Sequence, residues 1–206
     1  MTTIAVVSAG LSEPSSTRLL ADRLAAAAGA ALAGESAGPV EVRNVDLRPL
    51  AHEITDAMLT RFSAPALAAA TATVVEADAV VFVTPVFTAG MSGLAKSFLD
   101  VLDKDALTDM PVLLGATGGT ARHSLALEHG IRPVFAYLRA AVVPTAVFAA
   151  TDDWGSDDAG VLDARIRRGG ADLAWALRAS RRQPQQADAL PAVTDFSSLL
   201  GGLQHR

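Results

Sequence analysis

The chain has 206 residues, of which 50% are hydrophobic and 19% are charged, with a formal net charge of −5 and no cysteine. This length and apolar content predict one domain with a continuous core and exclude disorder over most of the chain. The negative charge argues against a nucleic-acid-binding surface, and the lack of cysteine excludes disulfides, thiolate nucleophiles, iron–sulfur clusters and cysteine zinc sites.

The first half of the chain alternates strand and helix patterns. The β-branched run 4–7 predicts a buried strand, and Ser15, Ser16 and Thr17 are N-cap candidates for a helix that continues to about residue 32. Residues 40–45 predict a second strand, whose alternating charges suit an edge of the sheet. A short helix within 49–62 and a longer one over 64–76 are expected to follow.

The second half repeats this alternation. Residues 79–83 predict a third strand, followed by a helix with Leu94, Phe98 and Leu102 on one face. A fourth strand begins at Pro111, a helix that contains Pro133 spans 125–138, a fifth strand spans 141–149 and a last helix spans 161–178. This α/β pattern predicts a parallel sheet covered on both faces, and five strands suit the doubly wound class with the order 2-1-3-4-5.

The composition changes near the end of the chain. We expect one domain over residues 1–182 and a tail over 183–206, which is either flexible or docked on a partner subunit through the apolar segment 196–200. A basic leader is missing and the alanine-rich stretch 24–34 is shorter than the roughly 20 residues of a membrane span. We therefore expect a cytoplasmic protein without a membrane partner.

Ligands of doubly wound sheets bind beyond the carboxyl ends of the strands, where three unusual loops are expected. The first loop, residues 8–17, is rich in hydroxyls and opens a helix, so its free amides and the helix dipole would attract a phosphate. It has neither the P-loop lysine nor a GxGxxG motif, which favours a monophosphate. The alternative is that Ser15 to Thr17 only cap the helix.

The second and third loops carry weaker signals when each is taken alone. In the loop 84–93, Pro85 stiffens the strand exit while Phe87 and Met91 offer apolar surface to a flat ring; the alternative is a plain turn with a serine cap. In the loop 116–120, two adjacent glycines expose amides to ring oxygens or an anion, although such pairs are often only turns. The Arg122–His123 pair could meet the phosphate of a second nucleotide.

Other chemistry finds little support in the sequence. The four histidines form no metal-binding pattern, and no Gly-x-Ser-x-Gly elbow is present. The acidic pairs at 152–153 and 157–158, which flank Trp154, are interpreted as a solvated loop. We therefore expect no metal site and no hydrolase triad.

The segments SAGLSEPSSTRLL, TPVFTAGMSGLAKSFLDVLD and ATGGTARHSLALEHGIRPVFAYL resemble the NADPH-dependent FMN reductase family of flavodoxin-like fold. They are most similar to the branch that feeds reduced flavin to two-component monooxygenases. Phe87 departs from the tyrosine of many relatives, and Met91 departs from the tyrosine of a sulfonate-linked, tetrameric subgroup.

The resemblance implies a site for FMN and for NADPH or NADH, in which hydride passes from nicotinamide C4 to flavin N5 without an indispensable catalytic side chain. The FMN phosphate would be held by one group of residues, the isoalloxazine edge by a second and its pyrimidine side by a third. These groups are Ser8, Ser15, Thr17 and the amide of Ser16; Pro85, Val86, Phe87 and Thr88; and Thr117, Gly118, Gly119 and Thr120.

The expected function is thus an NAD(P)H-dependent FMN reductase that supplies reduced FMN to a flavin-dependent monooxygenase. We also expect a homodimer or homotetramer. Two alternatives are a reductase of quinones or azo dyes that retains FMN as a prosthetic group, and a flavodoxin-like electron carrier without NAD(P)H activity. A carrier is usually far more acidic than this chain with its net charge of −5.

Overall fold

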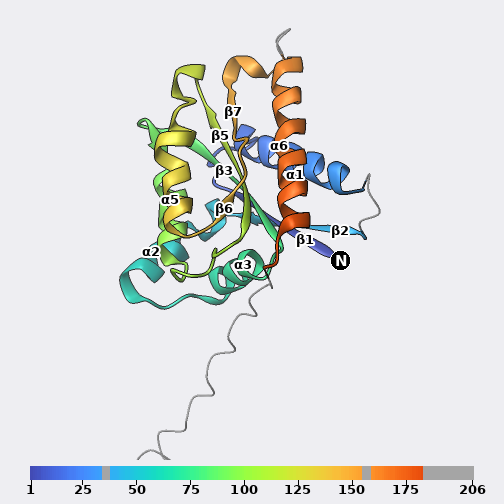
Figure 1. Ribbon diagram of the computed structural model, residues 1–206. Helices are drawn as coiled ribbons and strands as arrows, with labels where there is room; N and C mark the ends of the chain where they lie inside the picture. Colours follow the sequence, from blue (N-terminus) through green and yellow to red (C-terminus); the bar gives the residue numbers. More distant parts are fainter. Residues whose placement is uncertain (34–37, 155–158, 183–206) are drawn as a thin grey trace, which may run out of the picture.

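A parallel β-sheet forms the middle layer of the computed structural model, which describes residues 1–33, 38–154 and 159–182. Figure 1 shows helices on both faces of this sheet. The strands are β1 (Thr2–Ser8), β2 (Val40–Asp46), β3 (Ala79–Phe87), β4 (Gly90–Met91), β5 (Pro111–Gly118), β6 (Ala141–Val142) and β7 (Val147–Ala150). The helices are α1 (Ser16–Ala33), α2 (Ala51–Thr60), α3 (Pro65–Val75), α4 (Gly93–Val101), α5 (Arg132–Tyr137) and α6 (Ala159–Ala179).

The strand order is β2-β1-β3-β5-β6, with β7 also paired to β5 and β4 paired to β3. The predicted order 2-1-3-4-5 is thereby confirmed for the five main positions, the last of which is shared by β6 and β7. All pairs among these are parallel, whereas β4 runs antiparallel to β3. The described sheet therefore has seven strands where five were predicted, within the doubly wound class that we expected.

The fifth predicted strand, 141–149, is divided because its middle leaves the sheet. Pro144 has no amide hydrogen to donate to a ladder. The Arg132 guanidinium donates instead to the carbonyl oxygens of Val143 and Pro144, each at 3.0 Å. The amide of Thr145 donates to Asp172 Oδ2 at 3.2 Å, so side chains from two helices replace strand partners.

The helix predicted over 125–138 is shorter and begins differently. Residues Leu127–Ile131 form a π-helical turn, and α5 starts at Arg132. Pro133 stands in the first turn of α5, where its missing amide hydrogen costs no helical hydrogen bond.

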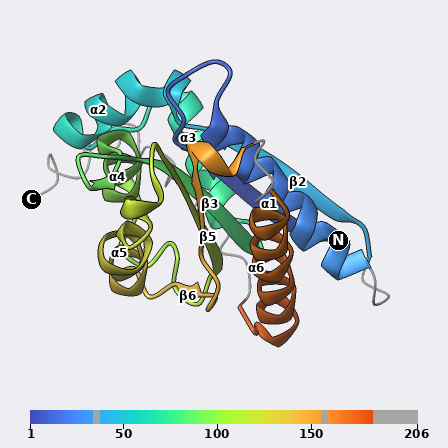
Figure 2. The ribbon, with the colours of Figure 1, turned by 90° about the horizontal axis from the view of Figure 1, so that it is seen from above.

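Two apolar cores lie on opposite faces of the sheet, and Figure 2 shows from above the helices that cover them. On one face α1 and α6 lie side by side and bury Leu20, Leu24 and Leu173 against the sheet. On the other face α2 to α5 cover a larger core, in which the rings of Phe82 and Phe135 meet edge to face with centroids 5.0 Å apart. Strands buried from both sides explain why the sequence shows continuous apolar runs.

Arg182, the last described residue, lies at the amino-terminal edge of the sheet. Its guanidinium donates to the carbonyl oxygens of Val75, Ala77 and Thr108, and its burial lowers the pKa of the group.

The predicted tail 183–206 lies outside the described residues. Within the described ranges no single helix has the length and hydropathy to cross a membrane, and only the bent pair 48–60 and 65–75 meets that test jointly.

Candidate functional site

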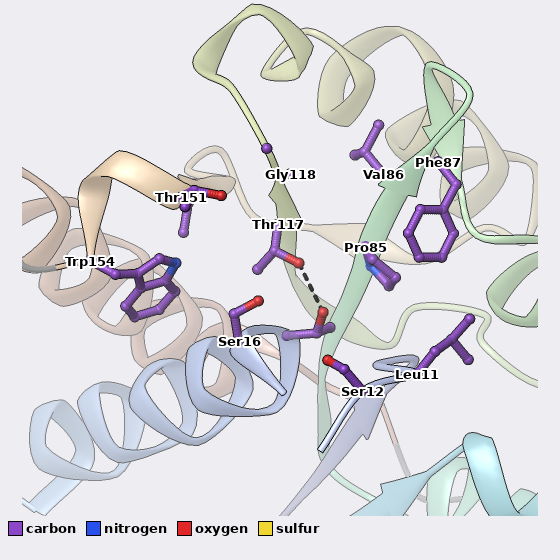
Figure 3. A pocket seen from close by; sticks show the side chains of 13 residues that line it. Leu11, Ser12, Ser16, Pro85, Val86, Phe87, Thr117, Gly118, Thr151 and Trp154 are labelled. Atoms are coloured by element: carbon purple, nitrogen blue, oxygen red, sulfur yellow. Dashed lines mark hydrogen bonds between the residues drawn. The ribbon is translucent and has the colours of Figure 1, made fainter. Parts of the chain in front are cut away.

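A cavity of about 420 Å³ lies at the carboxyl ends of β3, β5 and β7, beside the start of α1. All three loops singled out from the sequence reach it, so they converge on one site (Figure 3). Its walls combine hydroxyls, glycines and apolar side chains. They are formed by Leu11, Ser12, Ser16, Thr17, Pro85, Val86, Phe87, Thr117, Gly118, Gly119, Ala149, Thr151 and Trp154.

The first loop presents the free end of α1 to this cavity. Ser15 caps the helix, because its Oγ accepts from the amide of Arg18 at 3.2 Å and its carbonyl accepts from Leu19 at 3.0 Å. Among the described residues, the amides of Ser16 and Thr17 have no protein acceptor. Two unpaired donors at the positive end of an 18-residue helix form a suitable cradle for an anion.

A buried hydrogen bond joins the first loop to the third. Thr17 and Thr117 are 3% and 4% exposed, and their hydroxyl oxygens lie 2.8 Å apart. Figure 3 draws this bond between the start of α1 and the end of β5. It fixes the floor of the cavity between two segments that are 100 residues apart in the chain.

The second loop is a short hairpin, where a simple turn was the alternative. Val86 and Phe87 of β3 pair with Met91 and Gly90 of β4, and the tip places Thr88 at φ 48° and Ala89 at φ 64°. The base is held by the buried Thr84 Oγ1, which accepts from the amide of Ser92 at 3.1 Å. This base positions Phe87 at the rim of the cavity, where it is 48% exposed.

Ser92 also caps α4, as predicted by the alternative in which the loop 84–93 is a plain turn with a serine cap. Its Oγ accepts from the amide of Ala95 at 3.2 Å. The capping role and the hairpin coexist, so the turn-like signal did not exclude a role for the loop in the cavity.

The third loop brings bare backbone to the cavity. A β-carbon on Gly118 would stand 2.9 Å from Cζ of Phe148, which leaves no room for a side chain unless that ring moves. Gly119 is exposed beside it. Thr120 lies just beyond, where its Oγ1 accepts from the amide of Arg122 at 3.2 Å and caps the turn Ala121–His123.

Most of the residues predicted for the site lie together. Lining the cavity are Ser16, Thr17, Pro85, Val86, Phe87, Thr117, Gly118 and Gly119. Thr88 lies at the hairpin tip and Thr120 caps its turn, and neither is among the residues that line the cavity. Ser8 and Ser15 line a second cavity on the other side of the first loop.

Sequence reasoning missed Trp154 and Thr151, which follow β7. Trp154 is partly buried against the core beneath α1 and α6, and the Arg23 guanidinium carbon lies 5.7 Å from its ring centroid. Arg23 is held in turn by an ion pair with Asp163 of α6. The signal was available, because Trp154 follows the end of a parallel strand just as the three chosen loops do.

The structure corrects part of the expectation that the acidic pairs in this loop are solvated. Asp152 is exposed, but Asp153 accepts from the amide of Ala150 at 2.8 Å and faces Arg165 at 3.4 Å. These contacts hold the turn that presents Trp154. The second pair, 157–158, lies outside the described residues.

The lining also defines which chemistry the cavity supports. None of the described residues in its wall carries a carboxylate, imidazole, amine, guanidinium or thiol. The described chain also holds no cluster of three residues that suit a metal ion. Free amides and hydroxyls at one end, glycine backbone and an apolar wall fit a flat ring with an anionic tail. Among the described lining residues, no side chain is a general acid or base.

Comparison with known proteins identifies relatives of this architecture. The model of the family described as NADPH-dependent FMN reductase matches residues 2–155. A Pseudomonas aeruginosa protein named FMN reductase (NADPH) is 38% identical over 152 residues, which cover 73% of this chain and 78% of the relative. The NADH-dependent FMN reductase SfnF of Pseudomonas fluorescens is 35% identical over 167 residues, which cover 80% of this chain and 86% of the relative.

A solved structure supports the same grouping. The X-ray structure of an oxidoreductase from Corynebacterium diphtheriae superposes with a TM-score of 0.84 at 43% sequence identity. The match covers 87% of this chain and 98% of that one.

Proposed function

This chain belongs to the NADPH-dependent FMN reductase family, and we propose that the cavity between its three loops is where it binds FMN. The protein is an NAD(P)H-dependent FMN reductase, which decides against the electron-carrier alternative. The observation that carries the proposal is the convergence of Ser16, Phe87 and Thr117, from three distant loops, on one cavity.

We propose that the FMN phosphate binds at the start of α1. The unpaired amides of Ser16 and Thr17 and the hydroxyls of Ser12 and Ser16 supply donors, and the helix dipole favours the negative charge. Ser15 acts behind them by capping the helix.

The ring would then extend towards the second and third loops. Pro85, Val86 and Phe87 offer it an apolar edge, and Thr117 to Gly119 offer backbone donors and acceptors to its polar edge. In this proposal Thr88, Thr120 and Ser8 contribute by shaping the loops, because their side chains do not line the cavity wall.

When bound, FMN supplies the acceptor for a hydride donated by the nicotinamide. The described wall of the cavity lacks titratable groups, so the protein contributes by orienting the two rings and excluding water. We therefore assign no catalytic acid or base, and expect the rate to depend on how the rings stack.

We propose further that the reduced FMN is passed to a flavin-dependent monooxygenase in the cytoplasm. The support is the resemblance of the three loop segments to the branch of the family that serves two-component monooxygenases. The test is transfer: purified monooxygenase candidates should hydroxylate substrate when they are mixed with this reductase, FMN and NAD(P)H.

A homodimer or homotetramer is also proposed, through the outer face of α4 and α5. Leu99, Val134 and Leu138 line a groove of about 330 Å³ there, and Tyr137 on its rim is 83% exposed. Such apolar surface suits a second copy of the chain. Sedimentation of wild type and Tyr137→Asp would test this, with a shift to monomer expected for the variant.

The proposed FMN site is tested by the spectrum of the protein as isolated and by oxidation of NADPH and NADH with and without FMN. We expect FMN-dependent oxidation that saturates with FMN, and a loss of FMN affinity when the cavity is altered. Oxidation that is insensitive to substitutions in the cavity would overturn the assignment of this site.

A further inference from the structure

Two aromatic side chains, Phe87 and Trp154, stand among the described lining residues of the first cavity, which is proposed to bind FMN. Figure 3 shows Trp154 across the cavity from Phe87. Phe87 is held by the hairpin of β3 and β4, whereas Trp154 follows the turn Thr151–Asp153 after β7. The contacts that fix Trp154 are therefore separate from those that fix Phe87.

The backbone of Trp154 is held by this turn. Its amide donates to the carbonyl oxygen of Thr151 at 3.3 Å. Asp153 accepts from the amide of Ala150 at 2.8 Å and pairs with Arg165 of α6 at 3.4 Å. None of these contacts involves the indole ring, so they position the backbone and leave the orientation of the ring to other contacts.

The indole itself is contacted by Arg23 of α1. The guanidinium carbon of Arg23 lies over the ring, 5.7 Å from its centroid, within the roughly 6 Å at which a cation is attracted to an aromatic face. Arg23 does not line the cavity, and it stands two helical turns beyond Ser16, about 10 Å along the axis of α1. Its effect on the cavity therefore passes through Trp154.

Arg23 is fixed in turn by α6. Its Nη2 atom donates to Oδ1 of Asp163, and the two side chains are 35% and 41% exposed. A planar guanidinium can bond to a carboxylate and stack on a ring at the same time. Asp163, Arg23 and Trp154 thus form a continuous series of contacts from α6 to the wall of the cavity.

We propose that Arg23 is a positioning residue for flavin binding, because it holds the Trp154 indole in the orientation in which the ring forms part of the cavity wall. A ring that is already ordered need not be immobilised when the ligand binds, which increases affinity. This inference rests on the proposed function, since it requires that the flavin contacts the wall to which Trp154 belongs.

The binding test measures the Kd of FMN for wild type, Arg23→Gln and Arg168→Gln. Arg168 is the matched control, because it also pairs with an aspartate of α6, Asp172 at 3.6 Å, and its substitution removes the same charge. Its side chain is 75% exposed and does not line the first cavity. We expect the Kd to rise about three- to tenfold in Arg23→Gln and to stay unchanged in Arg168→Gln.

Riboflavin, which lacks the phosphate, separates orientation of the ring from attraction of the phosphate. Arg23→Gln should raise the Kd of riboflavin and of FMN by the same factor. A loss confined to FMN would show that Arg23 acts on the phosphate charge, and would overturn the inference. In the Trp154→Ala background, Arg23→Gln should not raise either Kd further, and an equal further rise would also overturn the inference.

A spectroscopic test observes the ring directly. Trp175→Phe leaves Trp154 as the only tryptophan of the chain. In that background Arg23→Gln should lower the fluorescence anisotropy of Trp154 and increase its quenching by acrylamide. Arg23→Lys, which keeps the cation but not the planar guanidinium, should restore part of both values. Unchanged anisotropy and quenching in Arg23→Gln would overturn the inference.

The same variants distinguish this inference from the proposed function. If Trp154→Ala weakens FMN binding and Arg23→Gln does not, the role of Arg23 fails and the proposed FMN site stands. If neither substitution changes the Kd of FMN, the assignment of the first cavity to FMN fails as well.

Discussion

The hydroxyl oxygens of Thr17 and Thr117 lie 2.8 Å apart and almost fully buried beneath the cavity. This contact ties the first turn of α1 to the end of β5, and so sets the spacing between the residues proposed to hold the phosphate and those proposed to hold the ring. A buried hydroxyl without a partner costs about 1–3 kcal/mol.

Thr117→Val should therefore lower the free energy of unfolding by about 1–2 kcal/mol, because it leaves Thr17 Oγ1 without its partner. FMN affinity should fall as well, because the first loop loses the hydrogen bond that connects it to the end of β5. Urea unfolding and FMN titration measure the two effects. A double-mutant cycle with Thr17→Val supplies the control. The free energy of unfolding should fall less in the double variant than the sum of the falls in the two single variants, and strict additivity would contradict the coupling.

The fold was predictable because it depends on local patterns. Apolar runs such as 79–83 occupy strands buried from both sides, and the helix start at Ser16 follows from the capping chemistry of Ser15. The division of the fifth strand was not predictable, because it depends on Arg132 reaching the carbonyl of Val143 across the fold.

The candidate site shows the same limit. The sequence identified the three loops, but not which side chains face the cavity. In the first loop this depends on close packing: a β-carbon on Gly10 would clash with Ser15 Oγ, so only glycine leaves room for Ser15 there. Ser15 lies on the side of the second cavity, and Ser16 lines the first. Such an orientation arises from contacts between loop residues, which spacing alone does not encode.

Ser16→Asp should weaken FMN binding at least tenfold. The substitution places a carboxylate in the cavity wall beside the proposed phosphate position, where like charges a few ångströms apart repel by a few kcal/mol at an effective dielectric constant near 20. Ser15→Asp is the matched control, because aspartate is an equally good helix cap and residue 15 lines the other cavity. Fluorescence titration of FMN should show a smaller loss of FMN affinity for Ser15→Asp than for Ser16→Asp. Equal losses of affinity would place the phosphate elsewhere.

Gly170→Ala should destabilise the protein by about 1–3 kcal/mol, because α6 crosses α1 at this residue with no room for a methyl group. A β-carbon there would stand 2.6 Å from the carbonyl carbon of Ala27 and 2.7 Å from the amide nitrogen of Ala28, both backbone atoms that cannot turn away. Gly160→Ala in the same helix is the control, since nothing lies within 4 Å of its β-carbon position. Thermal unfolding should show a lowered Tm for Gly170→Ala alone.

The Glu128–Arg132 pair predicts part of the acid sensitivity of the fold. The hydrogen bond from Arg132, 2.6 Å to Glu128 Oε2, lowers the pKa of Glu128 below its ordinary value of 4.5. A lowered pKa in the folded state adds stability above the unfolded pKa, and that stability is lost as the pH falls through the folded pKa. The Tm of wild type should therefore fall more steeply than that of Glu128→Gln below about pH 5; parallel curves would show that the pair contributes nothing.

The two tryptophans of the chain provide an optical test of where FMN binds. Trp154 lines the first cavity, whereas Trp175 is 66% exposed in the second half of α6 and belongs to the wall of a different pocket. Energy transfer to a flavin falls steeply with distance, so the flavin should quench Trp154 more strongly than Trp175.

Trp154→Phe should therefore remove most of the FMN-induced quenching, and Trp175→Phe should leave most of it in place. Because Trp154 also forms part of the wall, Trp154→Ala should weaken FMN binding several-fold, in keeping with about 1 kcal/mol for one aromatic contact. Steady-state fluorescence during FMN titration of the three variants measures both effects. Quenching that persists in Trp154→Phe and disappears in Trp175→Phe would place the flavin at the other end of α6 and contradict the proposed site.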